Sequence, residues 1–139
     1  MESLPFIDEH AVSVDASPER VWSALVETLR RTVGGSEAFA RLLGCEPVRS
    51  TDRFDGSIGQ TLPGFRVVDA EPGHRLALEG RHRFSRYRLT FVLDEDSVRA
   101  RTDAAFPGVL GRLYRAAVIG TRAHALITRR LLRRITRRA

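Results

Sequence analysis

The chain has 139 residues, of which 42% are hydrophobic and 29% charged, a balance typical of a single globular domain and unlike that of a disordered chain. Its one cysteine, Cys45, excludes an internal disulfide and a cysteine-based zinc site. The first nine residues lack the basic and apolar regions of a signal peptide, and no apolar run approaches the roughly 20 residues of a membrane span, so we expect a cytoplasmic protein.

The net charge of +6 is unevenly distributed along the chain, and all 23 basic residues are arginines. Residues 1–79 carry eight arginines against thirteen acidic residues, a net charge of −5. Residues 80–139 carry fifteen arginines against four acidic residues, a net charge of +11, and six of these arginines lie in the last eleven residues. The basic character therefore belongs to the second half of the chain.

The first predicted strand covers residues 10–16, where apolar and polar side chains alternate. Ser17-Pro18-Glu19 then predicts the start of a helix, because serine caps free amides, proline suits the first helical position and an acid favours the positive end of the helix dipole. Apolar residues at helical spacing follow, and Gly34-Gly35 ends this helix. A second short helix is predicted over residues 36–43.

The middle of the chain reads as a succession of strands, predicted over residues 47–54, 61–69, 75–82, 86–94 and 98–106. The last two alternate most clearly and are joined by Asp94-Glu95-Asp96, so we expect them to pair as a hairpin. Their outward positions carry four arginines, with Glu79 and Asp103 nearby, which predicts cross-strand charge pairs: Arg86, Arg88, Arg99 and Arg101. No aromatic side chains interleave with these arginines, so we expect no specific nucleic-acid binding.

One long helix is predicted from Pro107 to Arg138, since apolar residues keep a three-and-four spacing throughout. It would be about 48 Å long, whereas nine-residue strands span about 30 Å. Its basic end, residues 129–139, would therefore overhang the sheet. That end, Arg129 to Arg138, either binds an anionic surface or acidic partner, or is a solubilising end whose leucines close the rim of the sheet.

This order of elements resembles the START-related SRPBCC superfamily, also called polyketide cyclase/dehydrase-like. The stretches that carry the resemblance are residues 12–25, with Ala16-Ser17-Pro18-Glu19-Arg20-Val21-Trp22 at their centre, residues 63–76, and the closing hairpin with the helix after it. The resemblance covers nearly the whole chain. It implies an α+β helix-grip fold, in which a curved antiparallel sheet wraps around a long C-terminal helix, with two short helices after the first strand. It also implies a pocket for a hydrophobic ligand.

The inward phase of the predicted strands and the facing helix indicate which residues line such a pocket. His82 and Tyr87 would lie at one end of it, where an imidazole and a phenol could polarise a ligand carbonyl or hydroxyl, or could simply be ordinary hairpin residues. His124 would lie at the edge of the apolar stripe of the helix, near Thr128. The full predicted lining is Leu76, Leu78, His82, Tyr87, Leu89, Phe91, Leu93, Ala117, Val118, Thr121 and His124.

The residue patterns typical of metal binding, phosphate binding and nucleophilic catalysis are missing from the sequence. The four histidines show no close pairing typical of a metal site, and no glycine-rich phosphate loop or Gly-x-Ser-x-Gly motif is present. No base lies near Cys45 in the sequence, so we interpret it as a small buried hydrophobe. We therefore expect no metal and no cofactor.

Three functions remain open from the sequence. The first is binding or carrying a small hydrophobic molecule, of lipid, polyketide or aromatic type, between the sheet and the C-terminal helix. The second is a cyclase, dehydratase or isomerase that acts on a polyketide-like or aromatic substrate without a cofactor, with His82 and Tyr87 as the catalytic pair. The third is a non-catalytic interaction module that uses its basic C-terminal helix.

Overall fold

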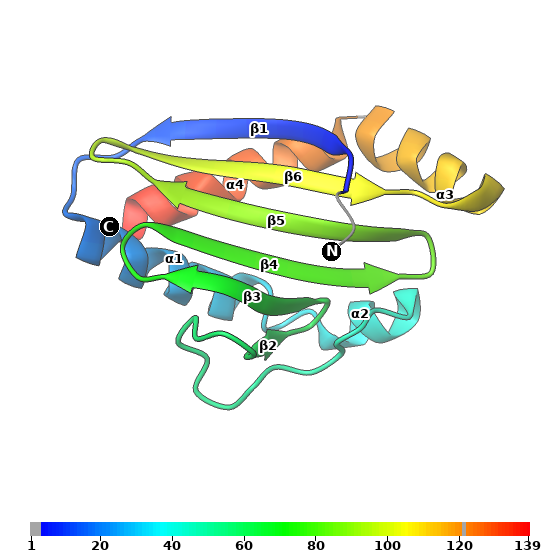
Figure 1. Ribbon diagram of the computed structural model, residues 1–139, viewed down its shortest axis with the longest axis horizontal. Helices are drawn as coiled ribbons and strands as arrows, with labels where there is room; N and C mark the ends of the chain where they lie inside the picture. Colours follow the sequence, from blue (N-terminus) through cyan, green and yellow to red (C-terminus); the bar gives the residue numbers. More distant parts are fainter. Residues whose placement is uncertain (1–3, 121) are drawn as a thin grey trace.

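The computed structural model describes residues 4–120 and 122–139, and its centre is a six-stranded antiparallel sheet (Figure 1). The strands lie in the order β1-β6-β5-β4-β3-β2, so the first strand pairs with the last. In the view of Figure 1, the two long helices lie behind the sheet. The elements are β1 (Phe6–Ser13), α1 (Pro18–Thr32), α2 (Glu37–Leu43), β2 (Thr61–Leu62), β3 (Phe65–Glu71), β4 (Arg75–His82), β5 (Ser85–Leu93), β6 (Ser97–Ala105), α3 (Gly108–Arg115), the π-helical turn η1 (Ala116–Gly120) and α4 (Ala123–Arg138).

Helices α1 and α4 pack on one face of the sheet and form the core with it. Leu25 and Leu29 of α1 and Leu132 and Ile135 of α4 are almost completely buried, together with inward side chains of the sheet such as Phe91. Burial of apolar surface between these two layers is the main force that holds the C-terminal helix against the sheet. The predicted α+β helix-grip architecture is confirmed.

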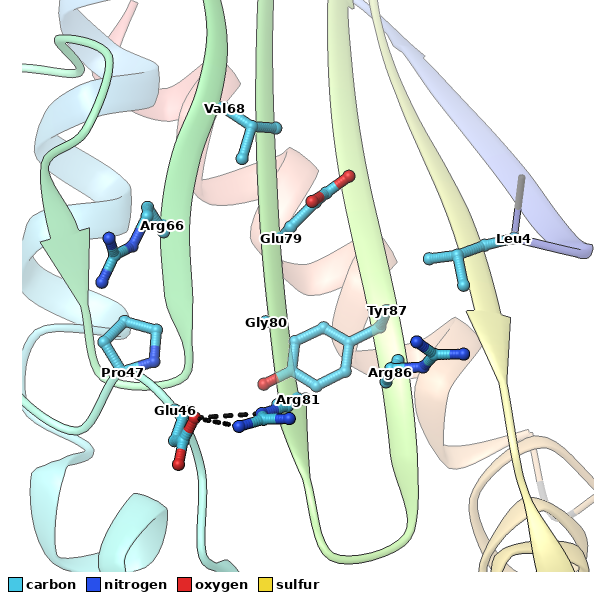
Figure 2. Close-up of a pocket in the computed structure, with 10 residues that line it drawn as sticks. All are labelled: Leu4, Glu46, Pro47, Arg66, Val68, Glu79, Gly80, Arg81, Arg86 and Tyr87. Carbon is cyan, nitrogen blue, oxygen red and sulfur yellow. Dashed lines mark hydrogen bonds and ion pairs between the residues drawn. The ribbon is translucent and has the colours of Figure 1, made fainter. Parts of the chain in front are cut away.

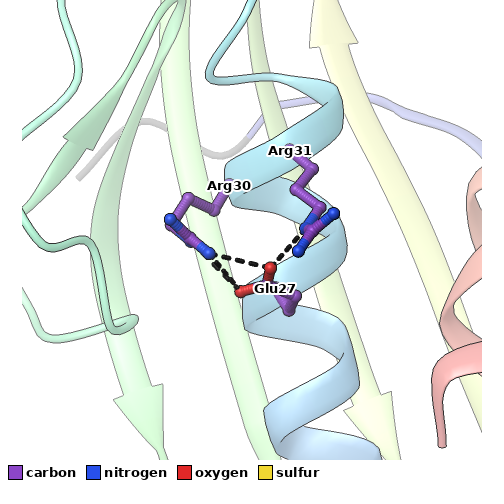
Figure 3. A network of polar contacts seen from close by, with 3 residues as sticks. All are labelled: Glu27, Arg30 and Arg31. Atoms are coloured by element: carbon purple, nitrogen blue, oxygen red, sulfur yellow. Dashed lines mark hydrogen bonds and ion pairs between the residues drawn. The ribbon is translucent and has the colours of Figure 1, made fainter.

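The start of α1 follows its sequence signals. The Ser17 hydroxyl accepts a hydrogen bond from the Arg20 main-chain N–H at 3.3 Å, and Pro18 occupies the first turn. Further along, the Glu27 carboxylate accepts hydrogen bonds from Arg30 and Arg31 on the exposed side of the helix (Figure 3). These two guanidinium groups lower the pKa of Glu27 to about 2.

The predicted hairpin is formed by β5 and β6. Leu93 pairs with Val98 next to the turn, and Tyr87 pairs with Ala104 at the far end of the ladder. The register puts the apolar set of β5 on the face that α1 and α4 cover. The sequence alternation therefore set the phase of these strands.

Three predicted strands differ from the structure. The first was predicted over residues 10–16, whereas β1 begins earlier, at Phe6, and ends at Ser13. Residues 47–60 form a loop in which the Gln60 side chain accepts hydrogen bonds from the Asp55 and Gly56 main-chain N–H groups, at 2.9 and 3.2 Å. These side-chain hydrogen bonds take the place of the main-chain hydrogen bonds that a strand would form with its neighbour. The segment 61–69 is split into β2 and β3, because Gly64 adopts a left-handed conformation with φ of +82° and turns the chain between them.

The predicted C-terminal helix is divided. It breaks at η1 and at Arg122, which has a positive φ of 63°, so α3 and α4 are separate helices. The broken segment contains Val118-Ile119-Gly120, residue types with low helix propensity. On α3, Gly111 lies against the main chain of Phe84 and Phe106, where a Cβ would come within 3.0 Å of both. This contact draws α3 toward the β4–β5 turn, away from the line of α4.

The expected overhang of the basic end is wrong. The 16-residue helix α4 is about 24 Å long, which matches the strands it crosses. Leu132 and Ile135 consequently lie in the core, while the six arginines between Arg129 and Arg138 remain exposed. In the described part of the chain, no helix has both the length and the apolar character needed to cross a membrane.

Candidate functional site

A cavity of about 380 Å³ lies between the inner face of the sheet and the helices α2, α3 and α4. Its wall is largely apolar, with Phe65 and Leu89 from the sheet, Leu43 from α2, Ile119 from η1 and Ile127 from α4. The cavity exists because α1 and α4 fill the inner face only along the other half of the strands. A largely apolar hollow with a few polar groups is the usual form of a small-molecule site.

The residues predicted to line a pocket divide into groups. Four border the cavity: His82, Tyr87, Leu89 and His124. Four others face the same side of the sheet but lie in the packed core beneath α1 and α4: Leu76, Leu78, Phe91 and Leu93. The break in the C-terminal helix leaves Ala117 exposed and keeps Val118 off the cavity wall, and Thr121 lies outside the described residues.

Aromatic rings gather at the end of the cavity next to the β4–β5 turn. The His82 ring lies 4.8 Å from the Tyr114 ring and 5.7 Å from the Tyr87 ring, measured between centroids. Tyr87 in turn meets Phe65 edge to face at 5.2 Å, and Tyr114 stacks on Phe84 at 5.3 Å. Such offset and edge-to-face arrangements leave flat apolar surfaces that suit another ring.

Tyr87 is held in place by a main-chain acceptor. Its hydroxyl donates a hydrogen bond to the Gly64 carbonyl at 2.6 Å, and Figure 2 shows its ring crossing β4 at Gly80. A Cβ on Gly80 would lie 1.8 Å from that carbonyl oxygen and 2.9 Å from the Tyr87 hydroxyl. Gly80 is therefore required for this contact. Burial raises the pKa of Tyr87, so the phenol stays protonated.

His82 is fixed as a neutral donor. Its Nδ1 accepts a hydrogen bond from the Phe84 main-chain N–H at 3.0 Å, which places the ring proton on Nε2. Nε2 lies 3.0 Å from the Ser85 Oγ and donates to it. Burial also lowers the pKa of His82. The pair has the spacing of a serine–histidine dyad, but this tautomer prevents His82 from accepting the Ser85 proton.

Two hydroxyl groups at this end of the cavity can donate a hydrogen bond to a ligand. Ser85 is buried and accepts from His82, so its own proton has no acceptor among the described residues. Tyr114 lines the cavity, and its hydroxyl makes no hydrogen bond to another described residue. Burial raises the pKa of Tyr114, which keeps this phenol a donor. The sequence did not single out Ser85 or Tyr114, although Ser85 is in phase with Tyr87 on the same strand.

His124 belongs to a separate polar group at the opposite wall. Its Nε2 lies 2.9 Å from the Thr102 Oγ1 and 3.4 Å from the Asp8 Oδ1, and the other Asp8 oxygen lies 3.2 Å from the His10 Nε2. Thr128, expected near His124, is buried, and its hydroxyl donates a hydrogen bond to the His124 main-chain carbonyl. This group ties the start of α4 to β1 and β6.

Cys45 is buried and borders the aromatic end of the cavity. Burial raises the pKa of its thiol, so it is protonated and weakly nucleophilic, as expected for a small buried hydrophobe. Among residues 4–120 and 122–139, no group of three or more histidine, cysteine, aspartate or glutamate side chains is placed to hold a metal ion.

The outer face of the sheet carries the predicted charge pairs. Arg88 bonds Glu79 across β4 and β5, whereas Arg101 lies 3.1 Å from Asp103 two residues along the same strand, β6. An open groove of about 700 Å³ on this side is lined by charged residues such as Arg66 and Arg81 together with uncharged ones such as Pro47 (Figure 2). Its Glu46–Arg81 pair, at 2.6 Å, offsets charge within the groove. The predicted cross-strand pairing is confirmed for Arg88 and Glu79. The apolar cavity on the inner face is the better ligand site.

No family model and no curated protein sequence matches this chain. Solved structures do resemble it. Protein CV1439 from Chromobacterium violaceum superposes with a TM-score of 0.57 at 16% identity, over 95% of this chain and 96% of that chain. Norcoclaurine synthase from Thalictrum flavum gives 0.56 at 13% identity, over 97% of both chains.

The di-domain ARO/CYC protein BexL, from the BE-7585A biosynthetic pathway, gives a TM-score of 0.51 at 15% identity, over 94% of this chain and 45% of that one. At these identities the likeness concerns the fold. Together with the strand order and the C-terminal helix packed on the sheet, it shows that this chain has the helix-grip fold that the resemblance to the SRPBCC superfamily implied.

Proposed function

We propose that the protein binds a small, largely planar hydrophobic molecule of aromatic or polyketide-like type, and that the ligand presents a hydrogen-bond acceptor to Ser85 and Tyr114. The observation that carries this proposal is the cavity of about 380 Å³, apolar over most of its wall and provided with two unaccepted hydroxyl donors at its aromatic end. Its volume lies at the lower end of the roughly 300–1,000 Å³ typical of small-molecule sites.

The two donors distinguish between ligand classes. An alkyl chain would exclude water and leave both hydroxyl protons without an acceptor, which costs about 1–3 kcal/mol per group. A ring that carries a carbonyl would satisfy them and would also stack within the ring cluster of His82, Tyr87 and Tyr114. The proposal therefore favours an aromatic or unsaturated carbonyl compound over a simple lipid chain.

Competition for the cavity by two probes of similar size tests this proposal. 2-Acetylnaphthalene carries a carbonyl and 2-ethylnaphthalene does not, and each is titrated against bound anilinonaphthalene sulfonate by fluorescence. We expect the wild type to prefer the ketone by about tenfold, the effect of one net hydrogen bond of about 1.4 kcal/mol.

The preference is expected to fall in a Ser85→Ala/Tyr114→Phe variant, while affinity for 2-ethylnaphthalene stays unchanged. Thr51→Val, which removes a hydroxyl away from the cavity, serves as the control. Equal affinity of the wild type for both probes contradicts the role of the hydroxyl groups, and a lack of binding of either probe contradicts the cavity.

A second candidate function is a cyclase, dehydratase or isomerase reaction without a cofactor. It is favoured by the meeting of His82 and Tyr87 at one end of the cavity and by the fold shared with norcoclaurine synthase and the ARO/CYC protein BexL. In this role, neutral His82 would donate through Nε2, and Tyr87 would leave Gly64 to reach the ligand.

The test of this function begins with native mass spectrometry of protein purified from its own host, which identifies a retained ligand. Conversion of that ligand is then measured for wild type, His82→Phe, Tyr87→Phe and the double variant. Loss of turnover in folded variants supports the catalytic pair. Wild-type turnover by the double variant removes these two residues from the chemistry.

A further inference from the structure

Seven large apolar side chains are exposed on the three helices that border the cavity, and we call them the apolar rim. Each is between 51% and 72% exposed: Phe39, Leu42, Val109, Leu110, Leu113, Leu126 and Ile127. Phe39 and Ile127 also line the cavity, so the rim lies at its mouth. Figure 1 shows that α2 and α3 stand at the same end of the sheet. A concentration of exposed apolar residues of this kind marks an interaction surface.

The part of the apolar rim on α3 and α4 is surrounded by charge of one sign, whereas α2 also carries Glu37, which pairs with Arg41. From Ala104 to the end of the chain there are nine arginines and no acidic residue. Arg112 lies between rim residues of α3, and Arg130 follows Leu126 by one helical turn. Within the described part of the chain, the arginines of α3 and α4 form no ion pair. The rim is therefore flanked by positive charge that the protein itself does not offset.

This charge decides what covers the rim. A second copy of the chain would bring two uncompensated positive surfaces together, which opposes association. An anionic bilayer offers both complementary features, since its acyl region accepts apolar side chains and its headgroups attract each nearby arginine by about 1 kcal/mol. We propose that the apolar rim and the arginines of α3 and α4 dock onto an anionic lipid bilayer, with the cavity mouth facing the lipid.

In this orientation a hydrophobic ligand passes between bilayer and cavity without crossing bulk water. That last step rests on the proposed function, whereas the docking itself does not. The sequence predicted that an anionic surface would bind residues 129–139. In the structure, Leu132 and Ile135 of this segment are in the core, and the exposed apolar residues belong mainly to α3 and α2. The proposed docking surface therefore lies at the cavity mouth.

Sedimentation with lipid vesicles tests the docking. The full chain is mixed with vesicles of phosphatidylcholine and phosphatidylserine at 70:30, or of phosphatidylcholine alone, at about 0.1 M salt. We expect binding to the mixed vesicles that weakens as salt is raised, and little binding to the neutral ones. Absence of binding by the wild type to the mixed vesicles overturns the proposal.

Paired variants separate the rim from general charge and hydrophobicity. Val109→Ser/Leu113→Ser is expected to weaken binding by about tenfold or more, whereas a control with two exposed apolar residues elsewhere, Ile58→Ser/Val68→Ser, binds as the wild type does. Circular dichroism and thermal melting establish that each variant is folded. Equal binding by the rim variant and the wild type overturns the proposal.

A second set of paired variants tests the role of the arginines. Arg112→Gln/Arg130→Gln is expected to lose roughly fivefold in affinity per residue, while Arg20→Gln/Arg66→Gln changes the net charge equally on other surfaces and has a small effect. An equal loss in both pairs would attribute binding to net charge alone and overturn the assignment to the rim. A wild-type dimer that Val109→Ser/Leu113→Ser converts to monomer would assign the rim to a second copy instead.

Failure of docking and failure of the proposed function give different results. The Ala104→Phe variant fills the cavity, so it is expected to lose 2-acetylnaphthalene but to keep vesicle binding. The Val109→Ser/Leu113→Ser variant is expected to show the converse. Probe binding without vesicle binding in the wild type refutes only the docking, and vesicle binding without probe binding refutes only the cavity function.

Discussion

Ala100 and Ala104 of β6 allow the cavity to be tested by one substitution made at two matched positions. Both lie on the inner face of the same strand, where Ala100 pairs with Phe91 and Ala104 pairs with Tyr87. Ala100 is completely buried in the packed core, whereas Ala104 borders the cavity. Ala117, which the sequence predicted to line the pocket, is exposed, so a substitution there would not test the cavity.

The two phenylalanine variants are expected to differ in stability. At position 100 the added ring has no space, and overpacking a close-packed core costs about 1–3 kcal/mol. At position 104 the ring enters a space of about 380 Å³, and its burial offsets the strain, so we expect a net change below about 1 kcal/mol. A change of 1 kcal/mol in the free energy of unfolding shifts Tm by roughly 2–4 °C in proteins of about 150–250 residues. We therefore expect the melting temperatures of the two variants to differ by several degrees.

Thermal melting and urea unfolding measure this difference, and displacement of anilinonaphthalene sulfonate reports the cavity. Ala104→Phe should remain near wild-type stability and lose the probe. Ala100→Phe should lose stability and keep the probe for as long as it is folded. Comparable destabilisation of both variants, with no probe binding by the wild type, would refute the cavity and the reasoning built on it.

Three further outcomes follow from the packing. Gly80→Ala should cost more than about 2 kcal/mol because its Cβ would meet the Gly64 carbonyl, whereas Gly35→Ala, whose Cβ would make only an ordinary contact at 3.8 Å with the Arg31 carbonyl oxygen, should stay within about 0.5 kcal/mol in the same urea titration. Ile135→Ala should cost about 2–5 kcal/mol, and deletion of residues 133–139 should unfold the protein by circular dichroism. Burial lowers the pKa of His82, so as the pH falls this histidine takes up a proton in the unfolded protein before it does so in the folded protein. The free energy of unfolding should therefore decrease as the pH drops below about 6.5. A His82→Gln variant with the same pH dependence as the wild type would contradict this.

Local sequence signals predicted a large part of this protein. Ser17 and Pro18 fixed the start of α1, because capping depends on neighbouring residues only. Alternation fixed the phase of β5 and β6, and with it the outward charge pair of Arg88 and Glu79, since a slip of one residue would have turned the apolar set of β5 to solvent.

Periodicity could not reveal where the C-terminal helix breaks. The apolar stripe runs through residues 107–138 without interruption, but Gly111 meets the main chain of Phe84 and Phe106 only after the sheet has formed. The break moves Tyr114 to the cavity and brings Ile135 into the core. A helical stripe shows which side is apolar and not what that side packs against.

By itself the sequence determined the start of α1, the inward faces of β5 and β6 and the concentration of positive charge in the second half, since these follow from local spacing and residue type. The helix-grip fold was implied by the family resemblance. The tertiary structure alone decided which inward residues are core and which border a cavity. Leu78 and His82 share a face of β4, yet α1 and α4 cover the first and not the second. The available donors, Ser85 and Tyr114, were likewise decided there, because a hydroxyl is free only when its folded neighbours leave it without an acceptor.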